Sequence, residues 1–85
     1  MSITMLYFAW VREAVGAGAE TVAPPPTIAT VGELVEWLAG RSAAHADAFA
    51  DRNRLRAAVD QRFVGLEASI LGAREIAIFP PVTGG

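Results

Sequence analysis

The chain ends on the segment Glu75-Ile76-Ala77-Ile78-Phe79, followed by Pro80-Pro81-Val82-Thr83-Gly84-Gly85. The first part of this segment is apolar and rich in β-forming residues, which predicts a strand. Two prolines then remove two N–H donors, so a paired strand cannot continue past Phe79. The final glycines have no side chain, which leaves a thin tip able to enter a channel too narrow for a Cβ atom. The sequence therefore predicts a firmly held strand that presents residues 80–85 as an extended tail.

A Gly-Gly ending also has ordinary explanations. Chain ends often fray without any function, and two glycines can be a cloning scar. The strand, the double proline and Gly84-Gly85 in succession favour a functional tail instead. This interpretation requires that the rest of the chain form a suitable holder.

Length and composition narrow the classes of protein to consider. The 85 residues suffice for one small domain, and 53% of them are hydrophobic, enough for a core. The absence of cysteine excludes disulfides, thiolate metal sites and a cysteine nucleophile within these residues. A net charge of −2 argues against a nucleic-acid-binding protein. No apolar run reaches the length of a membrane span and no secretory signal is visible, so we expect a cytoplasmic protein that does not act at a membrane.

The first third of the chain predicts a β-hairpin. Residues 3–10 alternate as a strand with two largely apolar faces, which is typical of a strand covered on both sides. Residues 11–15 predict one helical turn. Residues 20–23 predict a second strand, antiparallel to the first, which ends at a run of three prolines.

A helix is predicted to begin after Thr30. Thr30 and Glu33 have the spacing of a capping box, in which each side chain binds the other residue's backbone N–H. Apolar residues recur at i, i+3, i+4 and i+7 as one helical stripe, namely Val31, Leu34, Val35 and Leu38. Gly40 is placed to end this helix.

The remaining residues predict a short helix and three strands. The helix covers residues 43–50 and carries His45, which we interpret as a surface residue. Strands are expected at residues 55–60, 63–64 and 75–79. The last strand should lie beside the first and parallel to it, at the centre of the sheet. This order predicts an α+β protein of the β-grasp type, with a mixed sheet of about four to five strands and one main helix on one face. We expect a domain over residues 1–79 and an extended tail over residues 80–85.

Internal residues give little sign of an active site. There is no phosphate-binding loop, no Gly-x-Ser-x-Gly motif, and no second histidine or cysteine to join His45 at a metal. Acidic residues spaced along the helices are explained by capping and by contact with water. We therefore expect no metal and no bound cofactor. The carboxylate of Gly85 remains as a reactive group, since a mixed anhydride with a nucleotide makes such a carboxylate an acyl donor.

The chain resembles a known family in four segments. These are Glu75 to Gly85, Leu6-Tyr7-Phe8-Ala9 with Arg12-Glu13, Thr30-Val31 with Leu34, and Ala57-Ala58-Val59-Asp60-Gln61. They resemble the small, sulfur-carrier subunit of molybdopterin synthase, the MoaD type of the MoaD/ThiS ubiquitin-like family. The Phe-Pro-Pro-Val-Thr-Gly-Gly ending is the most specific part of this resemblance.

The resemblance implies a carrier that is not catalytic alone. An E1-like enzyme would use ATP to adenylate Gly85, and a sulfur donor protein would allow its conversion to a thiocarboxylate. The tail residues would then insert into the large synthase subunit and donate sulfur to cyclic pyranopterin monophosphate, forming the dithiolene of molybdopterin. Those tail residues are Pro80, Pro81, Val82, Thr83 and Gly84. The synthase of this family is a heterotetramer, and its catalytic residues are expected on the large subunit.

Alternation along the strands predicts a docking face. Ile76 and Ile78 should face the helix, which leaves Phe79 on the opposite side with Phe8 and Phe63. Three aromatic residues on an uncovered sheet form a plausible protein-binding patch. Each of them could equally belong to the core, and the resemblance favours the patch.

Two departures from the family pattern affect expectations. An acidic turn is frequent before the last strand, whereas this chain has Gly72-Ala73-Arg74-Glu75, which puts any contact through those acids in doubt. Asp60 replaces a frequent asparagine, which leaves the turn geometry there open. Two other functions also remain open: a sulfur carrier for thiamine or cysteine synthesis, and a ubiquitin-like modifier of protein lysines.

Overall fold

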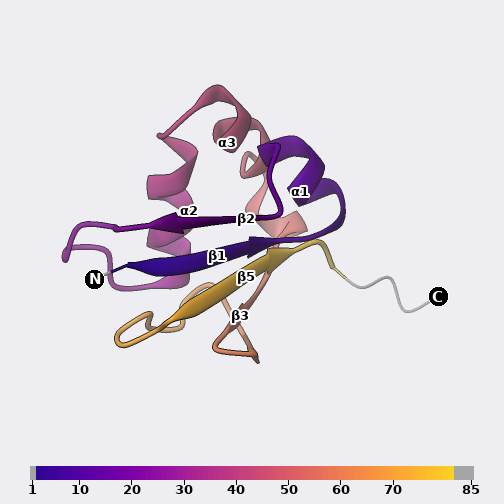
Figure 1. Cartoon of the computed structure of the whole chain (residues 1–85). Helices are drawn as coiled ribbons and strands as arrows, with labels where there is room; N and C mark the ends of the chain where they lie inside the picture. Colours follow the sequence, from indigo (N-terminus) through magenta and orange to yellow (C-terminus); the bar gives the residue numbers. More distant parts are fainter. Residues whose placement is uncertain (1, 82–85) are drawn as a thin grey trace.

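The computed structural model describes residues 2–81, which form one mixed sheet with helices packed on one of its faces (Figure 1). The elements are β1 (Ile3–Tyr7), α1 (Ala9–Val15), β2 (Ala19–Val22), α2 (Val31–Ala39), α3 (Ala43–Ala48), a 3-10 turn η1 (Arg52–Arg54), β3 (Arg56–Val59), β4 (Arg62–Val64) and β5 (Glu75–Phe79). The order of strands across the sheet is β2-β1-β5-β3-β4. This is the predicted α+β architecture.

β5 is the central strand of the sheet, as the sequence predicts. It pairs parallel with β1, where Tyr7 lies opposite Ile78, and antiparallel with β3, where Ala57 lies opposite the same residue. Strand β1 in turn pairs antiparallel with β2. The strand that precedes the tail is therefore hydrogen-bonded on both sides.

The core lies between the sheet and the helices. The alternate residues Ile3, Met5 and Tyr7 of β1 are buried, and so are Ile76 and Ile78 of β5. The apolar stripe of α2 covers them with side chains that are fully buried, namely Val31, Leu34, Val35 and Leu38. Removal of this apolar surface from water is the main stabilising contribution to such a fold.

The expectation that β1 is covered on both faces is wrong. Thr4 is exposed and Leu6 is only partly buried, because no helix covers that side of the sheet. The strand also ends at Tyr7, whereas the sequence suggested continuation to Trp10. Ala9 has φ of 53° and turns the chain directly into α1. A left-handed conformation is uncommon for alanine and gives no sequence signal.

The capping box at α2 is present as predicted. The Thr30 hydroxyl accepts a hydrogen bond from Glu33 N–H at 3.2 Å, and Glu33 Oε1 accepts one from Thr30 N–H at 3.1 Å. Glu33 Oε1 also accepts from Ala29 N–H at 2.8 Å. These contacts satisfy N–H groups that have no partner within the helix.

A two-residue turn connects β3 and β4. Asp60 and Gln61 both have positive φ, 47° and 71°, as the tight hairpin turn that suits twisted strands requires. Asp60 Oδ1 accepts hydrogen bonds of 3.0 Å from the N–H groups of both Arg74 and Glu75. The Asp60 carboxylate therefore accepts hydrogen bonds that an asparagine side chain could also accept at this turn. These bonds also fix the beginning of β5.

Candidate functional site

The exit of the tail is the first part of the candidate site. β5 ends at Phe79, next to the end of β1 and the beginning of β3, and the chain leaves the sheet there (Figure 1). Pro80 and Pro81 are partly buried at this exit. The predicted site residues Val82, Thr83, Gly84 and Gly85 lie outside the described residues.

The three predicted patch residues lie on the helix-free face, and we call Phe8, Phe63 and Phe79 the aromatic patch. Phe8 is 48% exposed and Phe63 is 85% exposed, whereas Phe79 is partly buried. The rings of Phe63 and Phe79 lie 5.8 Å apart at a tilt of 58°, a favourable aromatic geometry. Phe8 N–H donates to the Ile78 carbonyl at 3.3 Å, so Phe8 borders the end of β5 on the side away from β3.

Small residues form the middle of the same face. Ala58 of β3 lies opposite both Phe63 of β4 and Ala77 of β5. Leu6 of β1 lies opposite Ala77 on the other side. A hollow of 240 Å³ adjoins this row, where Arg56 and the rings of Phe63 and Phe79 contribute to its lining. The face is therefore apolar across four strands.

Sequence reasoning did not assign Ala58 or Arg56 to this face. Their positions depend on the register between strands that are distant in the chain, which alternation within one strand does not give. The signal available in the sequence was the presence of apolar residues on the second face of a strand whose first face is already buried.

A second cluster lies on the helix-covered side, and it corrects the interpretation of His45. The side chain of His45 is 12% exposed, and its Nε2 lies 2.7 Å from Glu20 Oε2 on β2. Its Nδ1 lies 2.7 Å from the hydroxyl of Ser42, which also accepts the His45 N–H at 3.1 Å. Tyr7 donates its hydroxyl to the same Glu20 oxygen at 2.7 Å. The histidine is therefore not a surface residue but a tie between α3 and the sheet.

The ionisation of this cluster follows from its contacts. Burial raises the pKa of Tyr7 far above its ordinary value, and the bond to Glu20 acts in the same direction, so its hydroxyl stays a donor. Burial alone would raise the pKa of Glu20, but the hydrogen bonds from His45 and Tyr7 and the positive charge of Arg41 outweigh it and lower that pKa. The carboxylate of Glu20 is thus held in its charged form. Ser42 acts as the N-cap of α3, so we interpret the cluster as structural.

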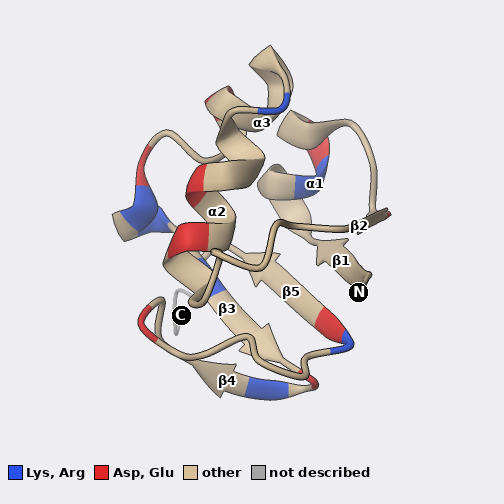
Figure 2. Ribbon diagram, turned by 90° about the vertical axis from the view of Figure 1, so that its left-hand side faces the viewer, with Lys and Arg blue, Asp and Glu red and all other residues tan. Residues whose placement is uncertain are grey.

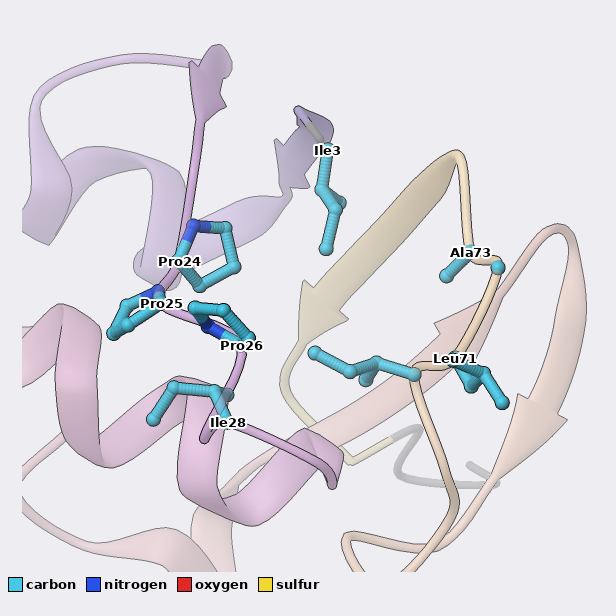
Figure 3. A pocket seen from close by; sticks show the side chains of 9 residues that line it. Ile3, Pro24, Pro25, Pro26, Ile28, Leu71 and Ala73 are labelled. Carbon is cyan, nitrogen blue, oxygen red and sulfur yellow. The ribbon is translucent and has the colours of Figure 1, made fainter.

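An apolar hollow lies at the opposite end of the sheet from the tail exit. It measures 310 Å³ and is lined by Ile3, residues 24–26, Ile28 and residues 70–73. Figure 3 shows the prolines and Ile28 on one side of it and Leu71 and Ala73 on the other. No titratable side chain lines it, so it offers no acid, base or nucleophile for a reaction.

Neither a metal centre nor a membrane span is found where the structure can be read. Between residues 2 and 81, no three side chains of the metal-binding types come together. Over the same residues, no helix has the length and hydropathy that crossing a bilayer requires. The features that stand out in the described chain are the tail exit and the aromatic patch beside it.

The fold and this exit define a small ubiquitin-like domain of the β-grasp type. Residues 5–85 match the model of the ThiS family, and the chain belongs to that family. It is 42% identical to the molybdopterin synthase sulfur carrier subunit of Escherichia coli over 98% of this chain and 99% of that protein. The protein of the same name from Haemophilus influenzae is 35% identical over the same shares. The crystal structure of small archaeal modifier protein 1 from H. volcanii is similar at a TM-score of 0.70 and 25% identity, covering 95% of this chain and 98% of that one.

Proposed function

We propose that this protein is the sulfur-carrier subunit of a molybdopterin synthase. The observation that carries the proposal is its 42% identity to a carrier of that name over nearly the full length of both chains. The structure is consistent with it, because the central strand β5 leads directly into residues 80–85. The reacting group of the proposal is the terminal carboxylate of Gly85, and the domain serves as its handle.

The chemistry begins with activation of that carboxylate. Its oxygen attacks the α-phosphorus of ATP on an E1-like enzyme, pyrophosphate leaves, and an acyl-adenylate forms. The outer sulfur of a persulfide on a donor protein then displaces AMP and forms an acyl disulfide on Gly85. A second thiol cleaves the S–S bond, so that a thiocarboxylate remains on Gly85 and the donor sulfur ends in a disulfide. In the synthase, that sulfur forms a bond to a carbon of cyclic pyranopterin monophosphate while a C–O bond of the same carbon breaks and its oxygen leaves. Water then cleaves the link to Gly85 and restores the carboxylate, so the carrier can be loaded again.

The domain contributes position rather than catalytic groups. Ile76 and Ile78 are fully buried, and paired strands flank β5 on both sides, so the base of the tail is fixed. The aromatic patch lies beside that base and would dock on the large synthase subunit. Docking there would hold the tail in one place, and proximity would raise the rate of transfer. The family's heterotetramer is the assembly we expect.

Reconstitution tests the proposal most directly. The thiocarboxylated protein is mixed with a large synthase subunit and the cyclic pyranopterin precursor, and formation of molybdopterin is measured. The proposal predicts two sulfur transfers per product and a return of Gly85 to the carboxylate, read by intact mass. A chain that lacks Gly84 and Gly85 should unfold at the same temperature and form no product. No product from the intact, loaded protein would refute the proposal.

A ubiquitin-like modifier is the second candidate function. The similarity to small archaeal modifier protein 1 favours it. A modifier would appear in cells joined through Gly85 to lysines of other proteins, seen as a ladder of conjugates. A carrier would appear as a free chain with one oxygen exchanged for sulfur. The same mass measurement identifies a sulfur carrier. Addition of enzymes of the thiamine or cysteine pathway to that protein then separates a carrier for those pathways from the proposed one.

A further inference from the structure

Three arginines lie together where the chain enters β3, and we call Arg52, Arg54 and Arg56 the arginine cluster. All three are exposed. Because β3 is antiparallel to β5, its first residue Arg56 lies opposite Phe79, the last residue before the tail. Figure 2 shows blue at the segment that leads into β3, whereas α2 carries red. The cluster therefore lies at the root of the tail.

Two of the three arginines are held in place without being neutralised. The Arg54 guanidinium stacks on the ring of Trp10 at 4.7 Å, and Arg56 Nη1 donates to the carbonyls of Leu55 and Asn53 at 2.8 and 3.2 Å. Within residues 2–81 the single side-chain ion pair joins His45 to Glu20, so no carboxylate pairs with the cluster. A fixed guanidinium loses less conformational entropy when it binds a carboxylate.

Two acidic residues lie nearby, and neither forms an ion pair with the cluster. Asp51 Oδ1 accepts a hydrogen bond from Asn53 N–H at 3.1 Å. Glu67 lines a hollow together with Arg52 and Arg56, but its carboxylate is folded back toward Gly65. The chain as a whole has nine acidic and seven basic residues, a net charge of −2. A local excess of positive charge on an acidic protein favours association with a partner that carries negative charge.

We propose that the arginine cluster binds an acidic rim on the protein that receives the tail. This inference rests on the proposed function and extends it to a second contact surface. The cluster is continuous with the aromatic patch, because Arg56 lines the same hollow as Phe63 and Phe79. Residues 80–85 span at most about 20 Å when extended. In the proposed complex the reacting end would enter the receiving protein by up to that length, while the arginines at the root of the tail would face the rim of the channel.

Binding at varied ionic strength tests this surface. The intact chain is titrated with a large synthase subunit, and the triple variant Arg52→Gln, Arg54→Gln, Arg56→Gln is compared with Arg41→Gln, Arg62→Gln, Arg74→Gln. Both variants lose the same charge, but the second changes arginines outside the cluster that do not line the hollow beside Phe79. We expect the first to bind at least about tenfold more weakly at about 50 mM salt, with the difference falling to about twofold at about 500 mM. The second should bind as the wild type does.

Two further measurements complete the test. Replacement of the cluster by three lysines should keep most of the affinity, which separates charge from the packing of Arg54 on Trp10. Thermal unfolding of each variant identifies any loss of fold. Equal weakening in both glutamine variants, or none in either, would overturn the inference, as would cluster-dependent binding of a short single-stranded RNA at the same salt. Sulfur transfer is measured separately at a saturating concentration of the large subunit. If the first glutamine variant transfers sulfur normally and binds with unchanged affinity, the proposed role of the arginine cluster is refuted, but the proposed carrier function is not.

Discussion

Tyr7 of β1 donates its hydroxyl to Glu20 of β2 at 2.7 Å, and the same Glu20 oxygen lies 2.7 Å from His45 Nε2. One carboxylate therefore links two strands and α3 on the covered side of the sheet. The ring of Tyr7 also packs on Phe49, with centroids 6.0 Å apart. Among the hydrogen bonds described for residues 2–81, the one from His45 to Glu20 is the polar contact that joins α3 to β2. Figure 1 shows α3 above β2.

Glu20→Gln should lower the free energy of unfolding by about 1–2 kcal/mol at neutral pH, because the charged acceptor is lost. The pKa of Glu20 is lowered in the folded state from its ordinary value of 4.5. The wild type therefore has this stabilisation in full above pH 4.5 and loses it as the pH falls through the lower, folded pKa. Urea unfolding of both proteins between pH 7 and pH 3 should show their difference shrinking toward acid. A constant difference would contradict this assignment.

Gln61→Gly should stabilise the protein by about 1 kcal/mol, because Gln61 has a positive φ that glycine adopts without strain.

Asp60→Asn should be close to neutral, since its amide oxygen can accept the same two backbone N–H groups. Asp60→Ala should cost about 1–2 kcal/mol, because Arg74 and Glu75 N–H lose that acceptor. Chemical denaturation of the three variants measures these values, and a neutral Asp60→Ala would show that the two contacts contribute little.

Local sequence signals predicted much of this fold. The capping residues Thr30 and Glu33, the helical stripe from Val31 and the apolar run of β5 each specify their element within a few residues. Central placement of β5 then follows from element order. These predictions were correct because short-range propensity and the global fold agree.

The incorrect predictions share a physical cause, which is that the deciding contact is distant in sequence. His45 looked like a surface residue because its partner Glu20 precedes it by 25 residues. Leu6 looked like a core residue because an apolar side chain on an uncovered face has the same pattern as one in a core. The left-handed turn at Ala9 has no glycine or asparagine to mark it. The roles proposed for the tail residues 82–85 stay predictions.

Phe63→Asp should strongly weaken docking while the domain stays folded. The side chain is 85% exposed on the short strand β4, so the change should cost about 1 kcal/mol of stability or less. A buried aromatic anchor in an interface typically contributes about 2 kcal/mol or more, so affinity for the large subunit should fall by at least about thirtyfold. Leu71→Asp is the matched control, because Leu71 is 94% exposed at the opposite end of the sheet. Calorimetric titration gives both affinities, and thermal unfolding verifies the fold. If Leu71→Asp weakened binding and Phe63→Asp did not, the receiving protein would dock at the far end of the sheet, and the aromatic patch would have no part in presenting the tail.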